Sequence, residues 1–205
     1  MAQSNTLIVE CIPGDDFDFE CSPCRLSRPQ RYRLWFALER AGLGDLVVLP
    51  PALSAAALLM SQLNDGGATL DERLIDEALD FGILHVRGLE TISQVVADLD
   101  SVDDHEVDRF VRDVLDAFCQ RPPHWSNVKR TVIDGWRAGR DFTVELRELP
   151  SLHGALLERR NRRWLPQLVE ASREGAFVAV GAAHLPGPVG LLALLESEGF
   201  SIGVL

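Results

Sequence analysis

Two side chains that can bind a metal ion follow two apolar runs of the kind found in buried strands. Glu10 comes directly after Leu7–Val9, and His184 comes three residues after Gly181, which ends the run Ala176–Val180. Because ligands bind beyond the carboxyl ends of the strands in an open α/β sheet, we expect both side chains at one site. A carboxylate and an imidazole together suit divalent cations of intermediate hardness. The competing interpretations are that Glu10 is only the first polar residue of a loop and that His184 caps its strand with a hydrogen bond.

A metal-dependent hydrolase is the enzyme class that these residue types favour. A divalent cation held by His184, Glu10 and a third ligand would lower the pKa of a bound water toward neutrality and polarise a carbonyl group. Arg160 and Asn161 add a guanidinium and an amide, which could clamp a substrate carboxylate or stabilise an oxyanion, each donor contributing on the order of 3 kcal/mol in a dry site. A solvated helix face is the interpretation that we assign to the other arginines of this segment, Arg159, Arg162 and Arg163.

The C-terminal quarter of the chain is predicted to position these groups. Apolar residues recur at helical spacing, then form a continuous run typical of a strand buried on both faces, and then resume helical spacing after a loop rich in proline and glycine. The predicted elements are a helix over Leu156–Gly175, the strand Ala176–Val180, a helix over Val189–Ser197 with Gly199 as its C-cap, and a last strand Ser201–Leu205.

The upstream part supplies further strands and helices. Glu90 follows a predicted strand and is a further candidate for the site, but a carboxylate there equally favours capping of the next helix. Thr69 and Glu72 form a capping box. The predicted strands are Asn5–Cys11, Val47–Leu49 and Ile83–Val86, and the predicted helices are Arg31–Ala41, 51–63, 69–81, Ile92–Leu99, Glu106–Cys119 and, more weakly, Val128–Ala138 and Phe142–Leu149, with a loop over Gly14–Gln30.

These elements indicate an α/β fold. We expect a central mixed or mostly parallel sheet flanked by helices, with a mainly helical insertion at about 92–150, in a single domain over residues 1–205. The composition, with 46% hydrophobic and 25% charged residues, is that of an ordinary globular domain.

The sequence motifs in this C-terminal quarter resemble those of the TraB/PrgY/GumN family. They are Arg160-Asn161-x-x-Trp164, the stretch Phe177–Gly187 with its Gly-x-x-His, the Gly190-Leu191-Leu192 sequence and the Gly199-Phe200 ending; a looser match covers Thr6–Glu10, Leu49–Leu59 and Gly88–Thr91. That family is similar to the Tiki proteases and, more remotely, to erythromycin esterases and ChaN. The resemblance implies that Gly181 and His184 match the family's Gly-x-x-His motif, Glu10 its first glutamate, and Arg160 and Asn161 its Arg-Asn pair. Tiki-like relatives are metal-dependent peptidases, which implies the same class here.

One family motif has no match in this sequence. Members carry a second Gly-x-x-His before the glutamate that Glu10 matches, and Met1 begins too late to include it. We therefore expect an N-terminally incomplete domain, or one that takes its missing strand from elsewhere. The alternative function is a catalytically impaired family member or fragment that acts as a binding or regulatory protein, because loss of one ligand weakens metal binding. A missing strand also predicts association of copies through the exposed sheet edge near Glu10.

The charge of the chain excludes several partners. A net charge of −11 argues against a general nucleic-acid binder and a protein of anionic membrane surfaces. No apolar run is long enough to span a membrane, and the N-terminus lacks the pattern of a signal peptide. As written, the chain is expected in the cytoplasm, and it would be exported if a true start with a signal peptide lay upstream.

The cysteines and the other histidines give weaker indications of a functional role. Cys21 and Cys24 form one C-x-x-C without the second pair of a zinc ribbon, so free thiols in a loop are preferred to a redox or metal role. A structural or surface role is expected for the remaining histidines, His85, His105, His124 and His153.

Overall fold

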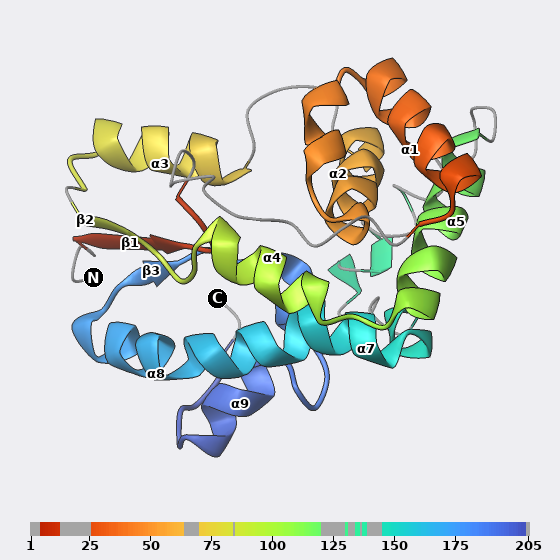
Figure 1. Ribbon diagram of the computed structural model, residues 1–205. Helices are drawn as coiled ribbons and strands as arrows, with labels where there is room; N and C mark the ends of the chain where they lie inside the picture. Colours follow the sequence, from red (N-terminus) through yellow and green to blue (C-terminus); the bar gives the residue numbers. More distant parts are fainter. Residues whose placement is uncertain are drawn as a thin grey trace. The chain divides into compact units, whose positions relative to one another are not determined.

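The structure, a computed structural model, describes residues 5–12, 26–63, 70–83, 85–119, 130, 134, 135, 137, 138 and 145–203 (Figure 1). The chain divides into two compact units. The first, called the sheet unit here, contains Met1–Asp18, Ala68–Val95 and Leu156–Leu205, and the second, called the helical unit, contains Phe19–Gly67 and Val96–Ala155. Each unit is therefore assembled from segments that are distant in the sequence.

The sheet unit is built on three parallel strands within the described residues. β1 (Thr6–Val9) lies in the centre, between β2 (His85–Gly88) and β3 (Phe177–Val178). Since parallel strands end at the same edge of a sheet, the residues that follow the three strands come close together. The backbone N–H of Glu90 donates to the carbonyl of Glu10 at 3.0 Å, which fixes the two chain segments at that edge.

Helices cover both faces of this sheet (Figure 1). Successive side chains of β1 point to opposite faces, and all three of Leu7, Ile8 and Val9 are buried. Leu7 and Val9 pack with Ala78 of α3 (Leu70–Asp80). Ile8 packs with Trp164 and Leu168 of α8 (Arg159–Glu174) and with Leu191 of α9 (Leu191–Ser197). Because helices cover both faces of β1, its sequence is a continuous apolar run.

Helix α8 places one polar residue on its buried side. Its buried residues are Asn161, Trp164, Leu168 and Ala171, a stripe at spacings of three and four. The helix ends at Gly175, whose φ of 71° is the left-handed conformation that favours glycine. Asn161 therefore lies in the core although asparagine is usually found at the surface.

The helical unit packs amphipathic helices around its own core. Leu34 and Leu38 of α1, Leu58 of α2, and Val111 and Leu115 of α5 are buried. The Glu106 carboxylate accepts backbone N–H groups of Ser151 and Leu152. Its elements are α1 (Arg28–Ala41), the 3-10 helix η1 (Gly44–Val48), α2 (Pro51–Leu63), α5 (Asp104–Cys119), the 3-10 helix η2 (Glu145–Glu148) and α7 (Pro150–His153). Along the sequence, the division between the units falls within α4 (Ile92–Asp100), after Val95, and within the π-helical turn Gly154–Glu158, after Ala155.

The α/β fold with a parallel sheet flanked by helices is confirmed, two strand predictions are wrong, and a third is correct in place but not in length or burial. Val47–Leu49 belongs largely to a 3-10 helix. Residues 201–203 of the predicted last strand are not in a strand. The run Ala176–Val180 contributes only a two-residue strand, whose Phe177 is 55% exposed, so it is not buried on both faces. β2 begins two residues after the predicted Ile83.

Several predictions fall outside the described residues. They concern most of the loop Gly14–Gln30, the capping residue Thr69, most of Val128–Ala138, Cys21, Cys24 and His124. Within the described part of the chain, no helix has both the length and the apolar character needed to cross a membrane.

Candidate functional site at the carboxyl ends of the strands

His184 is a buried histidine with one ring nitrogen hydrogen-bonded to an amide and the other directed at a carboxylate. It ends the short 3-10 helix η4 (Ala182–His184) and is 4% exposed. Its Nδ1 lies 2.6 Å from Oδ1 of Asn161, and its Nε2 lies 3.8 Å from Oε1 of Glu10, beyond hydrogen-bond range. Burial, and after it the positive charge of Arg160, lowers the pKa of His184 from 6.5 to about 3. The ring is therefore neutral at physiological pH.

Asn161 determines the tautomer of that ring. Its Nδ2 donates to the carbonyl of Val189 at 2.9 Å and to the carbonyl of His184 at 3.2 Å. Only the amide nitrogen can donate to two carbonyls, so the atom that faces His184 must be the amide oxygen, an acceptor. Nδ1 of His184 therefore carries the hydrogen and donates it to Asn161. The lone pair of Nε2 is left on the side of Glu10.

Glu10 is held from two directions. Its Oε2 accepts a hydrogen bond from Nη2 of Arg160 at 2.9 Å, and its Oε1 accepts the backbone N–H of Gly181. A Cβ at Gly181 would lie 2.9 Å from Oε1 of Glu10, closer than real Cβ contacts allow. Glycine at this position thus permits the close approach of the carboxylate to the backbone. Glu10 keeps Oε1 on the side of Nε2 of His184 as a result.

Glu90 is the buried anion of the same network. Its side chain is fully buried. The carboxylate accepts hydrogen bonds from Nε of Arg160 at 2.7 Å, Nη2 of Arg163 at 2.9 Å and Nε1 of Trp164 at 3.2 Å. Two guanidinium groups around one buried carboxylate satisfy its charge and its lone pairs together. Arg160, which also bonds Glu10, thereby links the two carboxylates.

Trp164 packs the network from the core side. Its ring is fully buried, lies 4.5 Å from the ring of His184 between centroids, and has the guanidinium carbon of Arg160 4.9 Å above it. The indole therefore excludes water from one side of both groups, which is the environment that lowers the pKa of His184.

The structure brings all six candidate residues of the sequence into this one network. They are Glu10, Glu90, Arg160, Asn161, Gly181 and His184. Their roles in catalysis or metal binding stay predictions. Glu90 bonds side chains of α8, and it is Thr91 that accepts the backbone N–H of Gln94 at the start of the next helix.

Sequence analysis missed three contributors. Arg163 was assigned to a solvated face, but it bonds the buried Glu90, whereas Arg162 is exposed and pairs with Glu158 as expected. Trp164 follows Arg160 by one helical turn, a spacing that would have indicated its contact. Asp71, in the first turn of α3, has its pKa raised by burial first and then by the negative charges of Glu10 and Glu72.

His184 and Glu10 have the right spacing for two ligands of one cation, but such a site needs a third. Two ligands each about 2.0–2.2 Å from a zinc-like ion lie on the order of 3–4 Å apart, and Nε2 of His184 is 3.8 Å from Oε1 of Glu10. A catalytic site of this kind takes three protein ligands. Among the residues that the structure describes, no group of three or more His, Cys, Asp or Glu side chains could hold a metal ion. Glu10 and His184 are therefore two candidate ligands, one fewer than such a site takes.

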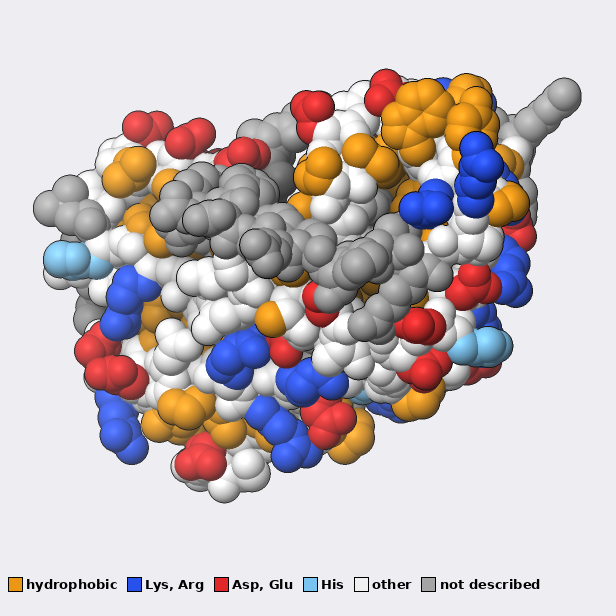
Figure 2. Space-filling view, in the orientation of Figure 1, with side chains coloured by type: hydrophobic (Ala, Val, Ile, Leu, Met, Phe, Trp, Pro, Cys, Tyr) orange, Lys and Arg blue, Asp and Glu red, His pale blue; other side chains and the backbone are white. Residues whose placement is uncertain are grey.

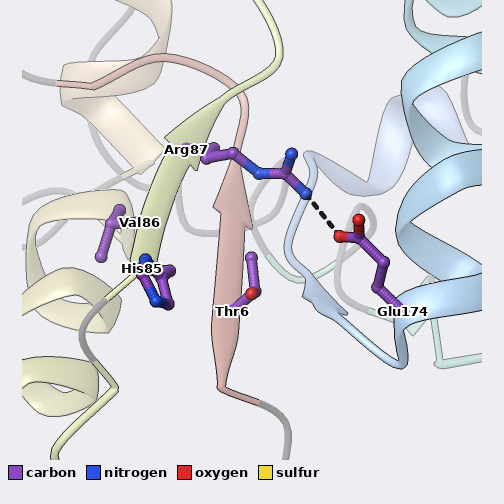
Figure 3. Close-up of a pocket in the computed structure, with 5 residues that line it drawn as sticks. All are labelled: Thr6, His85, Val86, Arg87 and Glu174. Atoms are coloured by element: carbon purple, nitrogen blue, oxygen red, sulfur yellow. Dashed lines mark hydrogen bonds and ion pairs between the residues drawn. The ribbon is translucent and has the colours of Figure 1, made fainter.

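A separate pocket lies at the opposite ends of the strands (Figure 3). It has a volume of about 320 Å³ and is lined by Thr6, His85, Val86, Arg87 and Glu174. Thr6 and His85 begin β1 and β2, and Nη2 of Arg87 bonds Glu174 at 3.1 Å across the pocket. Because both ions are about half exposed, the pair is a surface interaction. The pocket is distinct from the network around His184.

Comparison with known proteins identifies one family. The model of the TraB/PrgY/gumN family matches residues 24–203. No curated protein and no solved structure was found to match the chain. The matched range contains Glu90, Arg160, Asn161 and His184, whereas Glu10 precedes it.

Proposed function

Since the chain belongs to the TraB/PrgY/gumN family, we propose that it is a metal-dependent hydrolase, peptidase-like in the manner of Tiki proteases, whose site is the network around His184. The single observation that carries the proposal is the state of His184. A neutral imidazole donates Nδ1–H to an oxygen and directs Nε2 at a carboxylate 3.8 Å away. Metal-binding histidines are commonly oriented in this way by a hydrogen bond from the other ring nitrogen.

Each side chain of the network has a role in this proposal. His184 and Glu10 would be two of the ligands, and a bound divalent cation would activate a water and polarise a carbonyl group. Asn161 positions the His184 ring, because its amide oxygen and both of its N–H groups are committed to His184 and Val189. Arg160 positions Glu10 and neutralises Glu90. Three of the five N–H groups of Arg160 donate to Glu90, Leu156 and Glu10, so at most two are left for a substrate oxygen.

Metal binding to purified protein tests the proposal. We expect calorimetric titration with Zn²⁺ or Mn²⁺ to give one site per chain in the wild type, and His184→Ala and Glu10→Gln each to weaken binding by about tenfold or more. Glu10→Gln retains the shape of the side chain and tests the ligand charge without opening a cavity. His105→Ala, at an exposed position of the helical unit, is the matched control and should bind as the wild type does.

Circular dichroism of each variant separates loss of a ligand from loss of the fold. Folded His184→Ala protein with wild-type metal affinity would show that the site is misplaced. Hydrolysis of peptide and ester substrates in the presence of the bound ion then tests the reaction class.

A second candidate function is a catalytically impaired binding or regulatory protein. The observation that favours it is the charge balance of the network, in which Arg160 and Arg163 already neutralise the buried carboxylate of Glu90 and Arg160 also bonds Glu10. A guanidinium 2.9 Å from a ligand oxygen opposes the approach of a cation. This alternative predicts a folded chain with no stoichiometric metal and no hydrolysis, which metal analysis by mass spectrometry distinguishes from the hydrolase.

A further inference from the structure

Helix α1 exposes an aromatic face on the side opposite to its core contacts. Leu34, Ala37 and Leu38 are buried, whereas Tyr32 is 65% exposed and Phe36 is 51% exposed, with Trp35 also at the surface. These aromatic residues, at spacings of three and four, form one stripe of the helix, and the rings of Tyr32 and Trp35 lie 5.5 Å apart between centroids. Three large aromatic side chains on one helix face are characteristic of interfaces and unusual for a solvated surface.

Positive charge surrounds this aromatic stripe. Helix α1 contains four arginines and one glutamate, in a chain whose net charge is −11. Arg28 and Arg31 are exposed, and neither has an ion-pair partner among the described residues. Hydrophobic and basic side chains accordingly gather over α1 in the space-filling view (Figure 2). A partner for this face must combine apolar residues with negative charge.

Helix α3 of the same sequence has that composition. Its eleven residues include five carboxylates and one arginine. Ala78 packs against β1, while Asp76, Glu77 and Asp80 are exposed on the outward side. Leu79 is 54% exposed, and Phe81, directly after the helix, is 83% exposed. Acidic side chains lie along the outer edge over α3 in Figure 2.

We propose that the aromatic and arginine-rich face of α1 in one copy of this chain docks on the acidic outward face of α3 in a second copy. Tyr32, Trp35 and Phe36 then contact Leu79 and Phe81, and Arg28 and Arg31 face Asp76 and Asp80. Every copy carries both faces, so the contact forms either twice in a closed dimer or once per copy from head to tail. An anionic membrane is a poorer partner, because the rest of the chain is strongly acidic.

Charge reversal on each helix tests the pairing. Sedimentation velocity should show association of the wild type that weakens as salt is raised. Arg28→Glu/Arg31→Glu places acid against acid, and Asp76→Arg/Asp80→Arg places base against base, so each variant alone should associate about tenfold or more weakly. An equimolar mixture of the two variants should associate again, because each reversed face then meets its complement.

Two controls make the outcome decisive. Arg137→Glu/Arg173→Glu makes the same change in net charge at exposed positions outside both faces and should associate as the wild type does. Trp35→Ser removes apolar contact without a change in charge and should weaken association. A monomeric wild type, including one in which α1 and α3 pair within a single chain, overturns the proposal. So does a mixture that stays dissociated although both variants have the circular dichroism of the folded chain.

Discussion

Asn161 shows how a single buried amide can determine the chemistry of a neighbouring side chain. The helix stripe that buries it would ordinarily take an apolar residue, and an amide there needs partners for two N–H groups and one oxygen. The carbonyls of Val189 and His184 accept the N–H groups, and Nδ1–H of His184 satisfies the oxygen. Complete satisfaction of this amide leaves only one arrangement of the imidazole, with Nε2 as the acceptor on the side of Glu10.

The low pKa of His184 predicts a loss of stability in acid. Its value in the folded chain, about 3, lies below the 6.5 of an unfolded histidine, so the unfolded chain binds the additional proton between these values. The free energy of unfolding should therefore fall as the pH is lowered from about 6.5 toward 3, by on the order of 1 kcal/mol per pH unit from this group. Urea denaturation across this range measures the slope. The slope should be smaller in His184→Gln, and parallel curves for the two proteins would contradict the assigned protonation state.

The buried charge of Glu90 predicts a large difference between two otherwise equal substitutions. Glu90→Gln leaves Arg160 and Arg163 without their shared anion in a buried site and should destabilise the chain by about 3 kcal/mol. Glu158→Gln breaks only the exposed pair with Arg162 and should cost about 0.5 kcal/mol or less. Chemical denaturation of both variants is the measurement. Similar costs for the two variants would mean that Glu90 is not the centre of the network.

The loop between β3 and α9 depends on close approaches that side chains cannot make. A Cβ at Gly190 would overlap the backbone carbonyls of Leu185 and Pro186, and backbone atoms cannot move aside as a flexible side chain can. This tight packing follows directly after His184 and ends at the N-terminus of α9. The loop therefore holds η4, and with it the imidazole, in one conformation.

Gly190→Ala should accordingly be among the most disruptive single substitutions in the chain. We expect a loss of about 3 kcal/mol or more in the free energy of unfolding, because the loop must rearrange to admit the methyl group. Gly203→Ala is the matched control, since no heavy atom lies within 4 Å of its added Cβ, and it should change stability by about 0.5 kcal/mol or less. Thermal unfolding followed by circular dichroism compares them, and equal midpoints would contradict the tight loop.

Helices were predicted more reliably than strands, because β1, β2 and β3 all overlap predicted strands but two further predicted strands are not strands. The boundaries of α1, α2, α4 and α5 lie within about three residues of those expected, because amphipathic spacing and terminal prolines or glycines are local signals. A strand requires a partner elsewhere in the chain. A short apolar run such as Val47–Leu49 is equally compatible with a 3-10 helix, which is what forms there.

The site was predictable for a different reason. Glu10 and His184 were found from the rule that parallel strands end at one edge, and Arg160 and Asn161 from a motif. The involvement of Arg163 could not be found, since the sequence does not reveal that Glu90 is buried.

All parts of the network lie in the sheet unit, although they come from three distant segments of the chain. Glu10 and Arg160 are separated by 150 positions, and the helical unit occupies most of the intervening sequence. Closing such long loops costs conformational entropy that the buried contacts of the sheet unit must offset. The charged network thus joins the first, middle and last segments of this unit at a single point.

This separation into units predicts that damage to the network stays local. Asn161→Ala leaves two buried carbonyls and the Nδ1–H of His184 without partners and should destabilise the sheet unit by about 3 kcal/mol. Amide hydrogen exchange in β1 and α8 should then accelerate by roughly a hundredfold, since exchange there follows the opening free energy of that unit. The amides of α5 should keep their wild-type rates because they open with a different core. Arg162→Ala, an exposed change on the same helix, should alter neither region, and equal acceleration in α5 would establish that the two units unfold as one.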